Sequence, residues 1–461
     1  MENMINHLDN SDLTIEDLIN VKYREYWDYS NKNGKNAINP AEQIPEVVRK
    51  IIYAAYMLKF KIGDEHKTIE LSGETAKFHP HGDSSIQDSI KGVATAFKSQ
   101  PATRLLKGIG NFGYAPGDSG AAARYTSVTS TPLLQAIFND IKFLPFNTDD
   151  TGLEQPDYIS APLPLGLING VGAIGTGKSC YVAERNAKEV IEWIDELRKN
   201  NWEGIPTPAP MSVTGCKTWY EPSNGYIYYE AVVHKGVNPD DLTKKGRYDV
   251  ITALPPKSNA DIVITKLKAK LSNNKRVISK IVDGSGDNRP VWIIVPTGYL
   301  DEKDYNKYSM RNARKEQPYI WDNDLGTMCL SDITNIAHIW FDDRCKIASK
   351  RLQHDINELE KQNHKINLIK IFAENHMMDW SADKINDFYK KLDAENGESD
   401  AQIVLNQSAR AFLPENIKAN EITREKNQNN IDELNNEIKH IGDVVIDEAY
   451  KIIEKQEKFF A

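Results

Sequence analysis

Two long stretches in the last third of the chain repeat apolar residues at helical intervals, and the second does so at alternating steps of three and four positions. From Ile333 onward, the first repeat runs through Leu352, Ile356, Leu359, Ile366, Ile369 and Ala373. The second runs through Ile431, Leu434, Ile438, Ile441 and Val445. This spacing is typical of a coiled-coil seam. Because the two runs bracket residues 380–420, we expect an intramolecular helical hairpin, whose apolar tip near ARAFLP could pair with a second copy of the chain.

The size and composition of the chain narrow its class. At 461 residues it is too long for one compact core, so we expect roughly two to four folded units. Charged residues make up 27% and apolar residues 40%, as in soluble globular proteins. No run approaches the roughly 18 apolar residues of a membrane span, and the acidic start does not resemble a secretion signal. We therefore expect a cytoplasmic protein without membrane contact.

Cysteine usage agrees with a reducing compartment. The four cysteines are scattered without a C-x-x-C pair, so we expect reduced, structural thiols rather than disulfides or a zinc site. They are Cys180, Cys216, Cys329 and Cys345.

Charge is distributed unevenly along the chain. Residues 45–125 hold eleven Lys and Arg against eight Asp and Glu, a balance of +3. The formal net charge is −9, so the rest of the chain carries −12. A polyanionic partner should therefore dock on the front third and be repelled elsewhere.

The front third reads as helices joined by turns. Residues 13–28 space apolar side chains at helical intervals, and SNKNGKN then predicts a turn. From Pro45 we expect a helix that buries Val47, Ile51, Ala54, Ala55 and Leu58. On such a helix Arg49 and Lys50 would project away from the core.

A further helix is expected to begin at HPHG, with Asp83 or Ser84 as its N-cap. His79 and His81 flank Pro80, which stiffens the backbone and fixes the two rings relative to each other. On a basic module this arrangement predicts a phosphate clamp, and simple packing is the alternative. Helix, turn, helix and then a glycine-rich loop resembles a DNA-reading helical module.

From Gly225 the texture changes to GYIYYEAVVH, RYDVITALPP and RPVWIIVPTG, which are rich in β-branched and aromatic residues and separated by polar turns. We expect a mixed α/β insert here.

The stretch GNFGYAPGDSGAAARYT, residues 110–126, presents Arg124 and Tyr125 at the end of a run of small residues. Its glycines permit positive φ or a close backbone approach, so a large ligand could reach the phenol. A tyrosine beside an obligate cation is suited to attack a phosphodiester, because arginine neutralises the added negative charge of the transition state. Taken alone, the stretch also fits a core tyrosine beside a surface arginine.

GAIGTGKS, Gly172 to Ser179, fits the P-loop pattern in full, with Lys178 and Ser179 in the phosphate and magnesium positions. A P-loop follows a buried parallel strand, yet the preceding APLPLGLING is interrupted by Pro162 and Pro164. A P-loop NTPase is therefore an alternative only.

Three acidic pairs are possible metal ligands, but each lies in a turn-like or helix-start context, so we interpret them as solvated turns and caps. They are Asp149 with Asp150, Asp322 with Asp324, and Asp342 with Asp343.

Three segments together resemble one family. FHPHGDSSIQDSI (78–90), GIGNFGYAPGDSGAAARYT (108–126) and LINGVGAIGTGKSC (167–180) resemble, in order and spacing, the breakage-reunion part of type IIA DNA topoisomerases. That family includes the gyrase A subunit, the topoisomerase IV C subunit, the C-terminal half of eukaryotic topoisomerase II and the phage medium subunit. YDVITALPPKSNADIVITKLKAKL resembles its tower domain, and WDNDLGTMCLSDITNIAHIWFDDR the entry to its coiled coil, so the resemblance covers nearly the whole chain.

The resemblance implies residue roles. Tyr125 would form the 5′-phosphotyrosyl link and Arg124 would stabilise the transition state. Ile174 would wedge between base pairs and bend the DNA, which makes the P-loop look-alike a DNA-bending loop. The residues placed against DNA are His79, His81, Arg49, Lys50, Ser84, Ile174 and Lys178.

The resemblance also implies an α+β multidomain fold. A winged-helix DNA-gate domain with the catalytic tyrosine would span residues 41–160, after an N-terminal helical arm, residues 1–40. A mixed α/β tower domain would span 161–332. A long antiparallel coiled coil with a C-terminal dimerisation gate would span 333–461.

The chain shows neither the E-G-D-S-A and D-x-D-x-D motifs of a toprim domain nor ATPase motifs. The resemblance therefore implies that a partner subunit binds Mg²⁺ and hydrolyses ATP, that this chain holds no metal, and that a homodimer joins two partners as an A2B2 heterotetramer. We expect relaxation and decatenation of double-stranded DNA, in bacterial or phage-infected cytoplasm, and a layout closest to the phage medium chain. The main alternative is a non-catalytic DNA-binding architectural protein that retains the fold.

Overall fold

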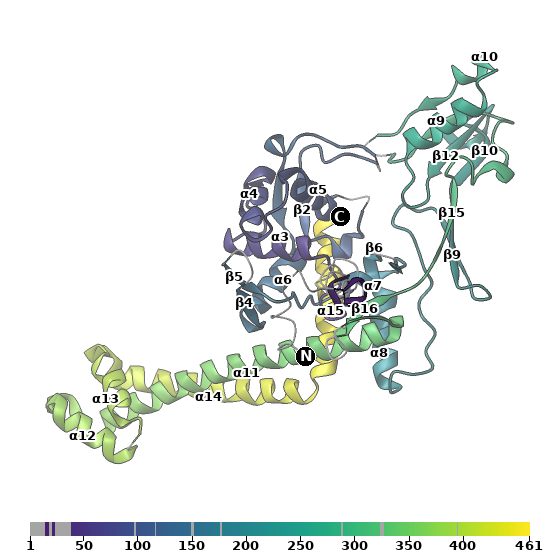
Figure 1. The fold of residues 1–461 in the computed structure, drawn as a ribbon. Helices are drawn as coiled ribbons and strands as arrows, with labels where there is room; N and C mark the ends of the chain where they lie inside the picture. Colours follow the sequence, from purple (N-terminus) through teal and green to yellow (C-terminus); the bar gives the residue numbers. More distant parts are fainter. Residues whose placement is uncertain are drawn as a thin grey trace. The chain divides into compact units, whose positions relative to one another are not determined.

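The computed structural model describes residues 14–17, 21–23, 38–95, 98–115, 117–148, 152–175, 178–286, 289–322, 327–393 and 395–461. The chain forms two compact units, which are described separately (Figure 1). The first unit comprises Met1–Arg344 and Ile446–Ala461, and the second comprises Cys345–Val445. Within the described ranges, no helix is both long enough and apolar enough to cross a membrane. The helix expected over residues 13–28 lies mostly outside these ranges, which retain α1 (Ile15–Asp17).

Three helices and a small sheet follow in the first unit. The helices are α3 (Glu46–Met57), α4 (Thr68–Phe78) and α5 (Asp83–Ala94). The antiparallel strands pair in the order β1 (His66–Lys67), β3 (Ser127–Ser130) and β2 (Leu106–Ile109). Fully buried apolar side chains from all three helices and from β3 form their common core: Ile51, Leu71, Ile86, Ile90 and Val128. The predicted succession of helix, turn and helix is confirmed.

The predicted N-cap of α5 is wrong. Gly82 occupies the N-cap position, with no side-chain hydrogen bond, and Asp83 is already the first helical residue. The reason is that Gly82, with φ −60° and ψ 134°, is the last residue outside helical geometry, so the helix begins one residue earlier than an N-cap at Asp83 would allow and two residues earlier than one at Ser84. Asp83 instead lies in the first turn, where its charge favours the helix dipole.

Short elements connect this part to the β-rich region. The helices are α6 (Pro132–Asp140), α7 (Leu165–Asn169) and α8 (Ala187–Lys199). Two antiparallel hairpins are formed by β4 (Phe146–Thr148) with β5 (Glu154–Pro156), and by β6 (Val171–Gly175) with β7 (Lys178–Val182). Thr131 caps α6 by accepting from the Leu134 amide at 3.3 Å, and Asn186 caps α8.

The β-rich region contains two antiparallel sheets, which confirms the mixed α/β texture predicted from Gly225. One has the order β11 (Asp241–Lys245), β10 (Val232–Asn238), β12 (Tyr248–Ala253), β14 (Ile293–Pro296) and β13 (Val282–Asp283). The other has the order β15 (Arg311–Lys315), β9 (Tyr226–Glu230) and β8 (Lys217–Glu221). The remaining elements are α9 (Ala260–Lys270), α10 (Lys275–Ile278) and the hairpin of β16 (Tyr319–Asp322) with β17 (Thr327–Leu330).

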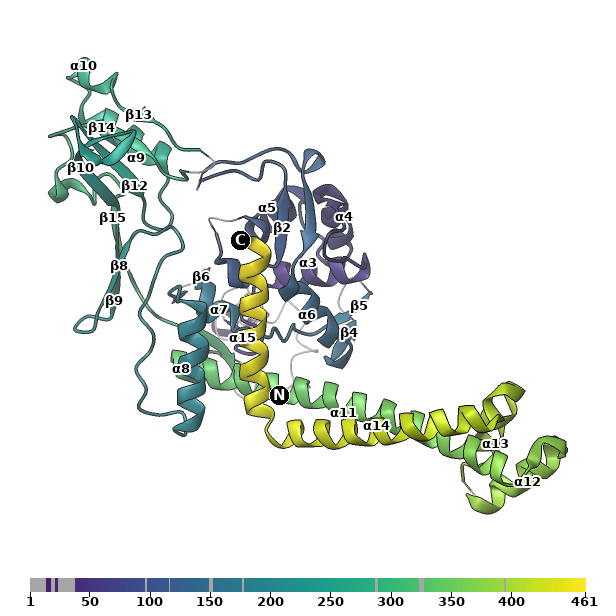
Figure 2. The same ribbon diagram turned by 180° about the vertical axis from the view of Figure 1, so that it is seen from behind.

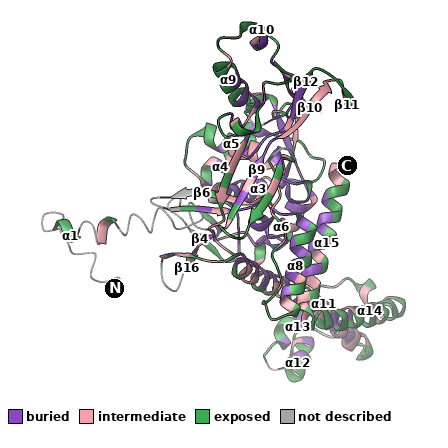
Figure 3. Cartoon of the chain, turned by 90° about the vertical axis from the view of Figure 1, so that its right-hand side faces the viewer, coloured by how far each residue is buried: buried purple, intermediate pink, exposed green. Residues whose placement is uncertain are grey.

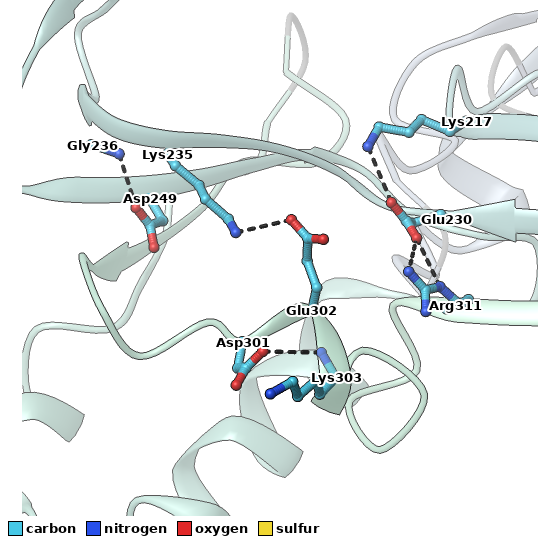
Figure 4. Close-up of polar contacts among 9 residues, drawn as sticks. All are labelled: Lys217, Glu230, Lys235, Gly236, Asp249, Asp301, Glu302, Lys303 and Arg311. Carbon is cyan, nitrogen blue, oxygen red and sulfur yellow. Dashed lines mark hydrogen bonds and ion pairs between the residues drawn. The ribbon is translucent and has the colours of Figure 1, made fainter.

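Ion pairs hold the strands of this region together (Figure 4). Glu230 on β9 accepts from Lys217 on β8 at 3.1 Å and from Arg311 on β15, so one carboxylate joins all three strands of its sheet. Lys235 on β10 donates to Glu302 at 3.0 Å. Burial alone would raise the pKa of Glu230, but the hydrogen bonds and charges of Arg311 and Lys217 together lower it, which favours the charged form.

The second unit is helical. It takes most of α11 (Ile333–Glu374), a helix of 42 residues, together with α12 (Ala382–Leu392), α13 (Gly397–Leu405) and α14 (Pro414–Lys439). A buried cluster joins α11, α12 and α13: Leu368, Phe372, Ile385, Tyr389 and Val404. Lys370 on α11 donates to Glu421 on α14 at 2.6 Å. The first predicted helical run is confirmed as one helix, and short helices occupy the segment between the two runs.

The second apolar run is not one continuous helix, as its spacing had suggested. α14 ends at Lys439, His440 departs from helical geometry with φ −115° and ψ 34°, and α15 (Ile441–Phe460) begins directly after it. From Ile446 the chain belongs to the first unit, where Ala449, Ile452 and Ile453 are buried. Buried and exposed residues alternate along α15 (Figure 3). The three-and-four spacing continues past His440 because α15, like α14, has one apolar face that is buried. In α15 this face packs within the first unit.

Arg344 anchors α15 in the first unit. Its guanidinium is fully buried and donates to Asp140 at the end of α6, to the Ser160 carbonyl, each at 3.0 Å, and to Glu448 on α15 at 3.2 Å. One buried cation thus fixes α15 against α6 and the start of α11.

Candidate active site

The glycine-rich loop after β2 has a defined shape. Gly113 has φ +89°, and a Cβ there would lie 2.6 Å from the Asp118 carbonyl oxygen, so only glycine fits. The Asp118 carboxylate accepts from the amides of Tyr114 at 3.0 Å and Gly120 at 2.9 Å, and these bonds lower its pKa. Lys91 on α5 donates to the Ser119 carbonyl at 2.7 Å. The loop is therefore held by its own hydrogen bonds and by α5.

Tyr125 follows this loop and points into solvent. It ends a short 3₁₀ turn, Ala123–Tyr125, and its side chain is 67% exposed, although its neighbours Ala123 and Thr126 are buried. Thr126 fixes the position: its carbonyl accepts from the Thr68 amide at 3.1 Å, and the two threonine hydroxyls are 2.8 Å apart. An exposed phenol thus stands on a backbone that α4 and β3 hold in place.

Arg124 accompanies the phenol. It is also exposed, and its guanidinium carbon lies 4.7 Å from the centroid of the Tyr125 ring. An accessible nucleophile with an adjacent, permanently charged donor fork is suited to bind a phosphate and to stabilise charge that develops on it. The alternative of a core tyrosine is wrong for this chain.

His79 and His81 are brought together as predicted. Their ring centroids are 4.2 Å apart at an interplanar angle of 75°, and the His81 amide donates to the His79 carbonyl at 2.7 Å. His81 is exposed and His79 partly so, and Ser84 and Asp88 on the first turns of α5 are exposed as well. The segment between α4 and α5 therefore offers polar groups to solvent.

Arg49 and Lys50 contradict their predicted exposure. They are 7% and 5% exposed, and all eight residues from Val48 to Ala55 are buried. Arg49 donates to Glu42 at 3.1 Å and to the Asp157 carbonyl, and Lys50 donates to Gln155. The apolar periodicity of α3 predicts only the face that packs against α4 and α5. The opposite face is covered by a second segment, around Gln155 and Asp157, more than a hundred residues away.

The partner of Arg49 is itself unusual. Glu42 is almost fully buried and accepts from the Ile159 amide at 3.0 Å as well as from Arg49. Burial raises the pKa of Glu42 to about 7, against the attraction of Arg49. This carboxyl is thus a titratable group beneath α3.

Ile174 and Lys178 lie on the hairpin of β6 and β7. Ile174 pairs with Ser179 and Gly175 with Lys178, in antiparallel register. Their side chains lie outside what the structure describes. A P-loop requires a strand, a loop and then a helix beginning at the Lys-Ser pair. Here that pair begins a strand, so the P-loop NTPase alternative is excluded.

Sequence reasoning missed a basic segment on α9 and α10. Six cations occur between Lys266 and Lys280 with no Asp or Glu from residue 262 to 282. All six are exposed; Lys270 pairs with Asp304 and Lys266 donates to Ser309, and the others are Lys268, Lys275, Arg276 and Lys280. The cluster of positive charge is visible in the sequence. It was overlooked because the charge outside residues 45–125 was considered only as one negative sum.

Among the described residues, no group of three or more His, Cys, Asp or Glu side chains is placed to hold a metal ion. Asp343 instead accepts from Tyr158 at 2.6 Å and Ser160 at 2.5 Å. Asp149, Asp150 and Asp324 lie outside the described residues.

Comparison with known proteins places these features in a family. The family model for the A subunit of DNA gyrase/topoisomerase IV matches residues 45–450. The chain is 30% identical over 276 residues to the DNA gyrase A subunit of Buchnera aphidicola subsp. Acyrthosiphon pisum, covering 55% of this chain and 32% of that protein. It is 25% identical over 409 residues to the DNA topoisomerase 4 A subunit of Neisseria gonorrhoeae, which covers 78% of this chain and 51% of that protein. It is also 25% identical over 392 residues to the DNA topoisomerase 4 A subunit of Staphylococcus epidermidis, covering 77% of this chain and 46% of that protein. The chain thus spans about a third to a half of the length of these curated relatives.

Proposed function

Because the chain belongs to the A-subunit family of DNA gyrase and topoisomerase IV, we propose that it is the DNA-cleaving and rejoining subunit of an ATP-dependent type IIA topoisomerase, an isomerase. The observation that carries the proposal is the exposed Tyr125 beside Arg124, on a backbone held by the glycine-rich loop and Thr126.

The proposed reaction is a transesterification. The Tyr125 oxygen attacks a backbone phosphorus, the bond to the 3′ oxygen breaks, and the 3′ oxygen takes up a proton as the 5′-phosphotyrosyl link forms. Attack by the 3′ hydroxyl reverses the exchange, so no bond energy is lost. A free tyrosine has a pKa near 10, so roughly one in a thousand is ionised at neutral pH and a cation must favour the phenolate. Arg124 supplies permanent charge at this position.

The cofactors are assigned to a partner subunit, in line with the family resemblance. Mg²⁺ bound there would supply further charge stabilisation to the phosphate, and the same subunit would hydrolyse ATP. Two copies of this chain and two partners would form an A2B2 heterotetramer, so that two Tyr125 side chains cut the two strands of one duplex.

The domain roles are part of the proposal. Helices α3, α4 and α5 with the sheet β1-β3-β2 support a winged-helix domain within residues 41–160. The two antiparallel sheets support a tower domain within residues 161–332. The helical second unit, with exposed Leu413 and Ile422, supports a coiled coil and dimerisation gate within residues 333–461. Residues 1–40 would form the N-terminal arm.

DNA contacts are proposed for three groups of residues. His79, His81 and Ser84 are accessible on the same helical module as Tyr125. Ile174 and Lys178 lie at the turn end of the hairpin β6/β7, a suitable place for a residue that enters the DNA stack. The exposed cations of α9 and α10 add a phosphate-binding surface. Arg49 and Lys50 are better explained as buried supports of α3 than as contacts.

Covalent cleavage is the direct test. Supercoiled DNA and Mg²⁺ are incubated with this chain and its partner subunit, and the reaction is quenched with detergent. The wild type should give protein-linked linear DNA, and Tyr125→Phe should give none. Tyr114→Phe is the matched control, because Tyr114 is a second exposed tyrosine (39%) on the same loop, and it should cleave like the wild type.

The same assay separates the alternative. A non-catalytic architectural protein would bind DNA with equal affinity in all three forms and yield no linked DNA from any of them. Equal cleavage by wild type and Tyr125→Phe would instead show that another residue is the nucleophile.

A further inference from the structure

A cleft of about 400 Å³ opens at the N-terminal end of α8, in the first unit. Helices α8 and α15 lie side by side there (Figure 2), joined by an ion pair of 2.8 Å between Lys188 and Glu457. The residues that line the cleft include Ser99, Arg104, Asn186, Lys188, Met211 and Glu457. None of them takes part in the proposed cleavage of DNA.

The cleft contains a buried cation without a counter-charge. Arg104 is only 9% exposed, and in the described part of the chain it makes no ion pair. Its guanidinium stacks on the Phe460 ring, 4.2 Å from the centroid, and its buried Nε finds no hydrogen-bond partner in the part of the chain that the structure describes. Stacking uses the flat face of the group and leaves its in-plane donors available. Buried cations are normally paired, because an unpaired one loses its hydration without compensation.

A second buried polar group belongs to the lining of the same cleft. Ser99 is 8% exposed, and its buried hydroxyl has no hydrogen-bond partner among the described residues. Buried hydroxyls in folded proteins are nearly always hydrogen-bonded. Ser99 and Arg104 thus both line one cleft, each with an unused donor just beneath its surface, and they lie on one short segment of the chain.

The remaining charges around the cleft balance each other. Lys188 is offset by Glu457, and both are largely exposed at the rim. The first amides of α8 are already used: that of Ala187 by Gln100 at 3.3 Å, and those of Lys188 and Glu189 by the Asn186 side chain. Helix α8 therefore contributes its positive dipole end but no free amide. The uncompensated charge in the cleft is that of Arg104.

We propose that this cleft binds a small anionic ligand through a phosphate or carboxylate group. Arg104 donates a bidentate pair of hydrogen bonds to two oxygens of that group, and the Ser99 hydroxyl donates to one of them. Glu457 at the rim limits the site to ligands whose charge is concentrated in one group, because a second acidic group toward the rim would meet the carboxylate. The proposal does not depend on the cleavage of DNA.

Thermal melting and titration calorimetry of the full chain test the site. The probes are inorganic phosphate and acetate, each compared with chloride at equal ionic strength, so that the two anion classes are separated from general salt effects. For the anion that binds, the melting temperature of the wild type should rise on the order of 2 °C at ten times the dissociation constant. Arg104→Met should abolish this rise and, by removing an unpaired buried charge, should raise the melting temperature in chloride.

Three further variants keep the result interpretable. Arg104→Lys keeps the charge but not the fork and should weaken binding about tenfold, which covers the case that Arg104→Met does not fold. Ser99→Ala should weaken binding several-fold. Lys107→Met is the matched control, since Lys107 is an exposed cation on the neighbouring aromatic ring, Phe459, and it should bind like the wild type.

Two results would overturn the proposal. One is a wild-type melting temperature that rises no more in phosphate or acetate than in chloride. The other is an anion-dependent rise that Arg104→Met and Arg104→Lys both retain, or that Arg124→Gln removes, because the anion would then be bound at the surface around Tyr125.

Discussion

Arg124 and Arg49 show how differently one side chain behaves in two regions of the molecule. Both were predicted from the resemblance to act on DNA. Arg124 is exposed beside an exposed phenol, whereas Arg49 lies under α3 between Glu42 and the Asp157 carbonyl. An exposed guanidinium is free to meet a phosphate, whereas the guanidinium of Arg49 is already paired inside the fold. The two arginines therefore differ in environment although they share one side-chain chemistry.

The largest effect is expected from removing the buried partner. At pH 9, where Glu42 is ionised in the wild type, Arg49→Ala should lower the free energy of unfolding by about 3–5 kcal/mol, because the Glu42 carboxylate would lose its buried cation. Chemical denaturation measures this, and Lys67→Ala, at an exposed cation, should change it by less than about 0.5 kcal/mol. If Arg49→Ala instead had normal stability but bound DNA at least tenfold more weakly, Arg49 would be a DNA contact as first predicted, and its contrast with Arg124 would be wrong.

The exposed arginine should show the opposite profile. Arg124→Gln should slow DNA cleavage by about 10² to 10³-fold, as expected when one charge-stabilising donor is lost. It should leave the free energy of unfolding within about 0.5 kcal/mol of the wild type. Single-turnover cleavage with Mg²⁺ and the partner subunit gives the rate. A loss of stability with an unchanged cleavage rate would mean that Arg124 is structural like Arg49.

The pH dependence of stability tests the buried pair of Arg49 and Glu42. The pKa of Glu42 is raised to about 7 in the folded chain, from an ordinary value of 4.5. The folded state therefore binds more protons than the unfolded state between these values, so the contribution of Glu42 is present below pH 4.5 and is lost as pH rises through 7. From pH 5 to pH 8 the wild type should lose on the order of 2 kcal/mol relative to Glu42→Gln.

Denaturation of both proteins at several pH values measures that difference. Using the difference removes the contributions of the other carboxyl groups, which Glu42→Gln leaves unchanged. Parallel pH profiles would mean that Arg49 keeps Glu42 ionised throughout the range.

The smallest effect is expected in the loop that presents Tyr125. Gly113→Ala places a Cβ 2.6 Å from the Asp118 carbonyl at φ +89°, which should cost about 1–2 kcal/mol of local stability. Cleavage should fall modestly because the loop that presents Tyr125 is displaced. Gly73→Ala is the matched control, because a Cβ there meets nothing within 4 Å and the residue lies inside α4. Hydrogen exchange of the loop amides, with the cleavage rate, would show whether the strain is confined to the loop.

Local patterns alone predicted much of this molecule. The apolar spacing predicted the 42-residue α11, the β-branched and aromatic segments from Gly225 predicted the strands, and the glycines before Arg124 predicted an accessible tyrosine. These features depend on residues a few positions apart, so a sequence window contains their causes. The ordered motifs also indicated the family that the comparisons show.

Only the tertiary structure decided which charged residues are buried. The contacts that bury Arg49 and Lys50 come from residues 108 and 105 positions away, and no periodicity within α3 encodes them. The break at His440 and the unpaired Arg104 are likewise set by packing against distant segments. The sequence therefore determined the chemistry that the chain carries, and the tertiary structure determined which of it reaches solvent, because burial depends on distant partners.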